Sequence, residues 1–148
     1  MKLSAPRTLW SDSVDRLPDN AIRHSRDKLR ESIAVDVAII GAGFTGLWTA
    51  YYLKRLAPQL SVAILEANQV GFGASGRNGG WCSTLFPAST SKLTKNFGAI
   101  AAREMYDAMV ANLSEISRVC SEEEIDCDWA QGGTLVAARN DMQLARAK

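Results

Sequence analysis

The stretch Val35–Gly46, VDVAIIGAGFTG, decides the fold of this chain. Its β-branched apolar residues stop abruptly at Gly41, which is typical of a strand buried on both faces of a parallel sheet. From Phe44 the apolar residues recur at helical spacing until Pro58 stops the pattern. A second apolar run, Val62–Leu65, ends on Glu66. The order strand, glycine turn, helix, strand predicts a βαβ unit.

The glycines between the first strand and the helix match the pattern G-x-G-x-x-G. Gly41 permits the tight turn, Gly43 lets the backbone approach a pyrophosphate, and Gly46 lets the helix pack closely on the sheet. The helix N-terminus offers N–H groups to the phosphates. Glu66, about 20 residues further on, stands where a carboxylate accepts hydrogen bonds from ribose hydroxyls. The pattern predicts dinucleotide binding, and the acid argues against NADP because it repels a 2′-phosphate.

A second glycine cluster, GFGASGRNGG at Gly71–Gly80, follows Glu66 directly. Taken alone it would be a flexible loop. Placed after the ribose-binding position, it is expected to return towards the cofactor, wrap a diphosphate and approach a flat ring system. The first glycines do not distinguish NAD from FAD, and this second cluster favours FAD.

The remainder of the chain contains fewer signals. Residues 1–34 are polar and are interpreted as an irregular N-terminal extension. Apolar spacings of three and four predict a long amphipathic helix over residues 97–119. A strand is predicted at Thr134–Ala138, with Asn140 or Asp141 as the N-cap of a following helix. We therefore expect an extension at 1–34, an FAD-binding unit at 35–95, and at 96–148 a helix with the start of a second β/α region, which would belong to an incomplete substrate domain.

Composition narrows the class of protein. The 148 residues carry a formal net charge of +1 and 47% apolar residues, so no global field attracts nucleic acid or an anionic membrane. The uncharged run at 37–52 is shorter than the roughly 20 residues of a membrane span. The three cysteines are interpreted as reduced thiols, and His24 has no second ligand near it. A cytoplasmic protein without a metal site is predicted.

Three segments together resemble a known family: VAIIGAGFTGLWTAYYL, the Leu-Glu that ends the second strand, and GFGASGRNGG. They are similar to the N-terminal part of FAD-dependent oxidoreductases of the D-amino-acid oxidase superfamily, which includes glycine oxidase and sarcosine oxidase. The branch that contains γ-glutamylputrescine oxidoreductase also has a segment similar to IDCDWAQGGTLVAARNDMQLA. The resemblance covers residues 35–148.

The resemblance implies a Rossmann-like FAD-binding fold and a set of residues around the cofactor. The first turn would hold the pyrophosphate, the end of the second strand the adenosine ribose, and the second cluster would line the way to the isoalloxazine. The implied cofactor-binding residues are Gly41, Ala42, Gly43, Phe44, Thr45, Gly46, Glu66, Ala67, Gly73, Ala74, Ser75, Arg77, Asn78, Gly79 and Gly80.

The implied reaction oxidises the C–N bond of a small amine or amino acid. Hydride passes to flavin N5, and the resulting imine is hydrolysed. Family members are longer, so the catalytic residues are expected outside these 148 residues, and the chain is expected to be an N-terminal portion that is unstable alone. One alternative is a non-catalytic dinucleotide-binding module that needs a second chain. Half of an NAD-dependent dehydrogenase is a third reading, disfavoured by the second glycine cluster.

Overall fold

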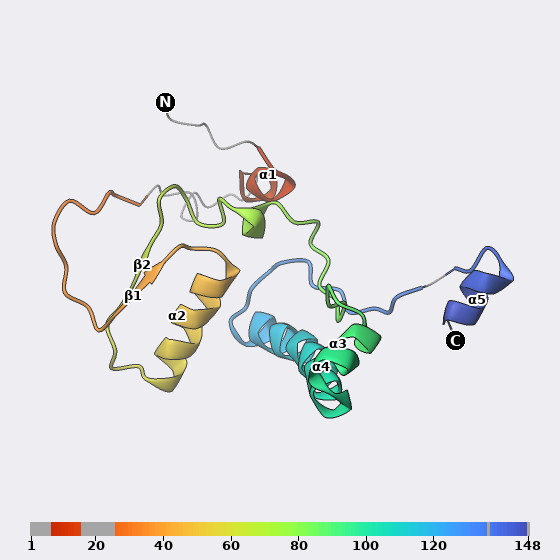
Figure 1. The fold of residues 1–148 in the computed structure, drawn as a ribbon. Helices are drawn as coiled ribbons and strands as arrows, with labels where there is room; N and C mark the ends of the chain where they lie inside the picture. Colours follow the sequence, from red (N-terminus) through yellow and green to blue (C-terminus); the bar gives the residue numbers. More distant parts are fainter. Residues whose placement is uncertain (1–6, 16–25, 136, 148) are drawn as a thin grey trace. The chain divides into compact units, whose positions relative to one another are not determined.

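The computed structural model describes residues 7–15, 26–135 and 137–147 (Figure 1). The chain divides into two compact units, Met1–Trp81 and Cys82–Lys148, which are described separately below. The predicted segment limits at residues 34 and 95 remain predictions. His24 and the rest of 16–25 lie outside the described residues.

The first unit contains the predicted βαβ order. Strand β1 (Val37–Ile40) leads through the glycine turn into helix α2 (Phe44–Leu56), and strand β2 (Val62–Leu65) follows. The strands are parallel, and their register pairs Val37 with Val62 and Ile40 with Leu65. Before β1, Asp36 accepts hydrogen bonds from the Ser61 N–H at 2.8 Å and the Ser61 hydroxyl at 2.7 Å, which aligns the two strand starts. The predicted α/β unit is therefore confirmed in part, as a two-stranded parallel sheet with its crossover helix.

The prediction that the first strand is buried on both faces is wrong for the described residues. Burial alternates along β1, and Ile40 is 81% exposed. Ile39 lies on the side of α2, since its Cγ2 atom would be 3.3 Å from a Cβ at Gly46. The strand is covered on one face because the described sheet has two strands and α2 is the helix that contacts both of them. A strand buried on both faces requires helices on both sides.

A short helix, α1 (Leu9–Asp15), lies within the predicted irregular extension, so that interpretation is wrong for these residues. The helix begins with a reciprocal cap: the Ser11 N–H donates to Thr8 Oγ1 at 3.1 Å, and the Thr8 N–H donates to Ser11 Oγ at 2.8 Å. Arg7 Nε pairs with Asp12 Oδ1 at 3.0 Å. The two hydrogen bonds between Thr8 and Ser11 satisfy N–H groups that a helix start otherwise leaves unpaired.

The second unit contains two packed helices where one was predicted. Helix α3 (Thr90–Phe97) begins at Ser89, whose Oγ accepts from the Lys92 N–H at 3.2 Å. Helix α4 (Ala99–Glu122) follows and packs against α3. Gly98 separates them with φ +88°, a conformation that a helix interior does not contain. The predicted continuous helix over 97–119 is corrected to a break at this glycine.

The C-terminal region contains one correct prediction and one error. Helix α5 (Asp141–Ala147) is capped by Asn140, whose Oδ1 accepts from the Gln143 N–H at 2.9 Å. The strand predicted at Thr134–Ala138 is absent from its described residues, and Val136 lies outside them. A strand needs a neighbour for its N–H and C=O groups, and the described part of the chain offers none here. None of the described helices has both the length and the hydropathy of a membrane span.

Candidate functional site

The first glycine turn is a close-packed reversal between β1 and α2. Gly41 has φ +98°, and its N–H donates to the Leu65 carbonyl at 2.7 Å. A Cβ on Gly46 would lie 2.1 Å from the Gly41 carbonyl oxygen, so only glycine allows α2 to start this close to the turn. The packing role expected of Gly46 is thereby seen directly.

The N-terminus of α2 offers hydrogen-bond donors. The N-cap residue, Gly43, has no side chain to cap the helix. The Phe44 N–H donates instead to Ser75 Oγ at 3.0 Å, from the second glycine cluster. The N–H groups of Gly43 and Thr45 have no acceptor among the described residues. Unpaired donors at a helix N-terminus, together with the helix dipole, favour binding of an anion.

Gly43 has a neighbour that the sequence did not reveal. A Cβ at this position would lie 3.0 Å from Ser75 Oγ, a tight contact that would require the Ser75 side chain to shift by a few tenths of an ångström. The expected approach of a pyrophosphate to the same backbone stays a prediction.

Glu66 joins the end of β2 to the first turn. Its Oε2 atom accepts from the Ala42 N–H at 2.9 Å, and its Oε1 atom accepts from the Asn68 N–H at 2.9 Å. These two hydrogen bonds lower the pKa of the Glu66 carboxyl below its ordinary value. The carboxylate is therefore ionised at neutral pH. Each oxygen keeps a free lone pair, which leaves Glu66 able to accept a ribose hydroxyl as well.

Ala42 connects the first turn with Glu66 and with the second glycine cluster. Its N–H binds Glu66, its carbonyl oxygen accepts from the Gly71 N–H at 2.9 Å, and it is 2% exposed. The second glycine cluster is thus hydrogen-bonded to the first turn, while its expected return towards the cofactor stays a prediction.

The second cluster repeats the geometry of the first turn. Gly71 has φ +72°, and a Cβ on Gly76 would lie 2.2 Å from the Gly71 carbonyl oxygen. Between them runs the short 3₁₀ helix η2 (Ala74–Gly76). Gly71 and Gly76 were missing from the predicted site residues. Their spacing, equal to that of Gly41 and Gly46, was the signal available in the sequence.

The end of the second cluster is folded by its own side chains. Asn78 Nδ2 donates to the Ser75 carbonyl at 2.7 Å, while Asn78 Oδ1 accepts from the Gly80 N–H at 2.8 Å. Arg77 turns back on its own loop: Nε donates to the Phe72 carbonyl at 2.9 Å, and the guanidinium carbon lies 4.9 Å from the centre of the Phe72 ring. Arg77 is not directed at the first turn in this structure.

The other predicted residues are placed but make few contacts. Phe44 is 56% exposed at the start of α2. The remaining predicted positions are also exposed, and they are Thr45, Ala67, Gly73, Ala74 and Gly79. A Cβ at Gly73 or Gly79 would meet nothing within 4 Å. The structure therefore brings together Ala42, Gly43, Phe44, Glu66 and Ser75. It shows no contact that defines a role for Thr45, Ala67, Gly73, Ala74 and Gly79.

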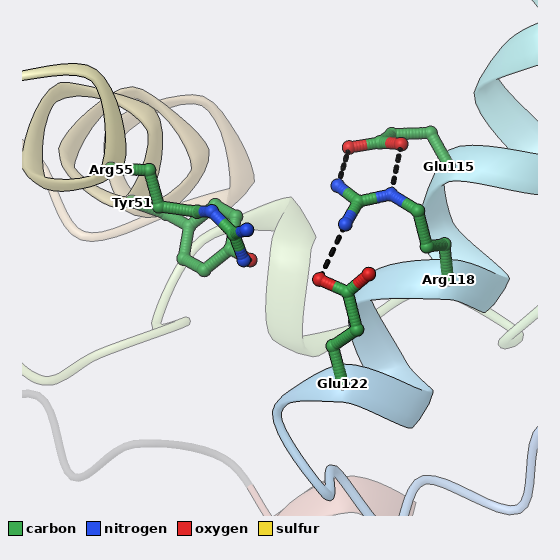
Figure 2. A network of polar contacts seen from close by, with 5 residues as sticks. All are labelled: Tyr51, Arg55, Glu115, Arg118 and Glu122. Atoms are coloured by element: carbon green, nitrogen blue, oxygen red, sulfur yellow. Dashed lines mark hydrogen bonds and ion pairs between the residues drawn. The ribbon is translucent and has the colours of Figure 1, made fainter.

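Two polar groupings away from the glycine turns are shown in Figure 2. In α4, Arg118 binds both Glu115 and Glu122, and these acids raise its pKa further above its ordinary value. In α2, Arg55 donates to the Tyr51 hydroxyl at 2.8 Å. Exposed pairs one helical turn apart typically stabilise a helix by less than about 1 kcal/mol. We assign them to helix stability.

Comparison with known proteins identifies the family. The sequence profile described as FAD dependent oxidoreductase (DAO) matches residues 36–148, most of the chain. The chain belongs to the DAO family. FAD is the cofactor of this family, and the family implies a Rossmann-like FAD-binding fold, in agreement with the βαβ unit.

Three curated proteins are similar to parts of the chain. Gamma-glutamylputrescine oxidoreductase of Escherichia coli is 40% identical over 119 residues, which is 80% of this chain and 27% of that protein. Sarcosine oxidase subunit beta of Rhizobium meliloti is 51% identical over 43 residues, 29% of this chain and 10% of that protein. Coproporphyrinogen III oxidase of Staphylococcus aureus is 47% identical over 55 residues, 36% of this chain and 12% of that protein.

The chain covers only a part of the length of each of these relatives. It spans about a quarter of the length of gamma-glutamylputrescine oxidoreductase. No solved structure matches the chain at a significant level.

Proposed function

We propose that this chain binds FAD through its two joined glycine turns, as the FAD-binding portion of an enzyme that oxidises the C–N bond of an amine or amino acid. The observation that carries the proposal is the Ala42 junction, which joins the first turn, the ionised Glu66 and the second cluster. Around it stand the unpaired Gly43 and Thr45 N–H groups, where a pyrophosphate would bind.

The residues present fit a dinucleotide. The α2 N-terminus would hold the pyrophosphate, and Glu66 would accept hydrogen bonds from the adenosine ribose. The second cluster, from Gly73 to Gly80, would continue along the cofactor towards its ring system. When bound, FAD supplies the two-electron chemistry, and the chain's own residues bind and orient it.

The amine substrate is supported by the names of two relatives. Gamma-glutamylputrescine oxidoreductase and sarcosine oxidase subunit beta are both named for compounds that carry an amine nitrogen. The name coproporphyrinogen III oxidase shows that similar segments also occur in a protein named for another class of compound. The word subunit in the sarcosine oxidase name supports a proposal that a second chain or further sequence completes the site.

The test is a titration of the purified 148-residue chain with FAD, followed by its visible absorption spectrum. We expect a resolved, shifted flavin band that saturates at one FAD per chain, and no comparable uptake of NADP. The matched control is Gly46→Ala, in which a Cβ would collide with the Gly41 carbonyl. A folded chain that leaves the spectrum of FAD unchanged contradicts the proposal.

The amine part is tested separately. Chain loaded with FAD is mixed anaerobically with a panel of primary amines, N-methyl amino acids and D-amino acids, and loss of the flavin absorption is recorded. Bleaching by one class identifies the substrate type. A loaded chain that no amine bleaches fits both an FAD-binding portion whose catalytic residues lie elsewhere and the alternative, a dinucleotide-binding module that requires another chain for activity.

A further inference from the structure

The N-terminal helix contacts the second glycine cluster through one tryptophan. Trp10 Nε1–H donates to the Asn78 carbonyl at 2.9 Å, across a sequence separation of 68 residues. Trp10 lies outside the family match, which begins at residue 36. Neither the family profile nor the glycine fingerprint assigns it a role.

The indole ring also lies against Gly80. A Cβ on Gly80 would be 2.8 Å from Cη2 and 2.9 Å from Cζ2 of Trp10, and Gly80 has φ +73°. Two features of this position favour glycine: its backbone conformation and the indole ring beside it. Trp10 is 37% exposed, so about two thirds of its surface is covered.

The indole is linked to the first turn through a chain of hydrogen bonds. Asn78, whose carbonyl accepts from Trp10, donates through its side chain to the Ser75 carbonyl. Ser75 Oγ in turn accepts from the Phe44 N–H at the start of α2. The Thr8 and Ser11 cap holds the first turn of the helix that carries Trp10.

We propose that Trp10 is a positioning residue of the candidate cofactor site, in which its indole N–H and ring hold the Asn78–Gly80 segment in place. This proposal rests on the proposed function, since it extends the FAD-binding site to a residue before the family match. Helix α1 is then part of the proposed cofactor site and not a separate N-terminal extension.

The first experiment needs no cofactor. Hydrogen exchange is measured at the Gly80 amide, which donates to Asn78 Oδ1, in the wild-type chain, Trp10→Phe and Trp10→Ala. Phe keeps a ring but lacks the N–H, so we expect exchange to be about 5-fold faster with Phe, the effect of one lost hydrogen bond, and faster still with Ala. Trp129→Phe is the matched control, because the Trp129 indole lies in the second unit and its N–H has no partner among the residues that the structure describes. Equal exchange in wild type and Trp10→Ala overturns the proposal, as does an equal change in Trp129→Phe.

The second experiment adds FAD to the same four proteins and reads affinity and the flavin band. We expect Trp10→Ala to weaken binding about tenfold and to shift the band, Trp10→Phe to lie between, and Trp129→Phe to match wild type. Equal affinity in wild type and Trp10→Ala, with the loop loosened, removes Trp10 from the cofactor site. A wild-type chain that binds no FAD contradicts the proposed function instead, and the exchange data still decide whether Trp10 positions the segment.

Discussion

The two glycine turns of the first unit have the same geometry and different consequences. In each, a glycine with positive φ is followed five residues later by a glycine whose Cβ would collide with the first glycine's carbonyl oxygen, at 2.1 Å for Gly46 and 2.2 Å for Gly76. The first turn leads into the 13-residue α2, which packs on both strands. The second leads into the three-residue η2, which ends in a loop.

The difference shows what glycine spacing can predict and what it cannot. The spacing predicts a tight reversal in both places. The segment that follows determines the use: α2 presents N–H donors, whereas η2 places Ser75 where it caps α2. The second turn thus supports the first. Variants of these turns and of Glu66 are expected to differ in effect, with the largest loss at Gly46 and the smallest at Glu66.

The largest effect is expected from alanine at Gly46, the second glycine of the first turn, and the matching change at Gly76 is its comparison. Gly46→Ala pushes a buried helix start against the Gly41 carbonyl and Ile39, so we expect a loss of about 3 kcal/mol in the free energy of unfolding. Gly76→Ala meets a similar clash in a short exposed loop that can shift, and we expect roughly 1 kcal/mol. Urea unfolding followed by circular dichroism measures both. Equal losses would show that the two turns are equally constrained.

Alanine at the first glycine of each turn is expected to have an intermediate effect. A Cβ at Gly41 meets nothing within 4 Å, so the penalty comes from φ +98° alone, about 1–2 kcal/mol. Gly71→Ala is expected to behave alike, because φ is +72° and its nearest neighbours are at 3.8 Å. Gly132→Ala, where the structure shows neither positive φ nor a neighbour within 4 Å, is the control and should leave stability unchanged. A similar loss in the control would remove backbone strain as the explanation.

Ser75→Ala tests the link between the turns. Losing the acceptor for the Phe44 N–H should lower stability by about 1 kcal/mol, as for other helix caps, and weaken FAD binding. Ser89→Ala removes the cap of α3 in the second unit and should cost a similar amount of stability without changing FAD affinity. FAD titrations of the two variants show whether Ser75 also affects cofactor binding. Equal affinities would show that Ser75 acts only as a helix cap.

The smallest effect is expected in the dependence of stability on acid pH, through the Glu66 carboxyl. The Glu66 pKa is lowered in the folded chain, so its contribution to stability is present above its ordinary value of 4.5 and is lost as the pH falls through the folded pKa. Urea midpoints measured from neutral pH to about pH 3 should therefore fall less steeply in Glu66→Gln than in wild type. The Asp36 pKa is also lowered, by Ser61, at the other end of the strands. Asp36→Asn should flatten the same curve without changing FAD affinity, and a fall in affinity would contradict the separation of the two ends.

Much of the first unit could be predicted from sequence because its signals are local. The β-branched runs, the glycines and Pro58 fix the order of elements, and the second strand was predicted with the bounds that the structure shows. A cap at Asn140 or Asp141 was likewise predicted from local sequence, and the structure shows that Asn140 is the residue that caps. The prediction of one helix over 97–119 failed because apolar spacing continued through Gly98 while the backbone did not.

Other features depend on parts of the chain that are distant in sequence. A run such as Thr134–Ala138 has strand propensity, yet a strand forms only beside another strand. The capping of Phe44 by Ser75 and the contact of Trp10 with Asn78 join segments that no short pattern connects. The sequence identified both glycine clusters, but it could not show which residues connect them.

The two hydrogen bonds of Glu66 affect any attempt to change the nucleotide preference of this chain. Admission of a 2′-phosphate would ordinarily begin by replacing this acid with a neutral or basic residue. That replacement would also take away the acceptor for the Ala42 and Asn68 N–H groups and loosen the first turn, where we propose that the pyrophosphate binds. A redesign would have to supply a new acceptor near Ala42 at the same time, which makes specificity at this position costly to alter by single substitutions.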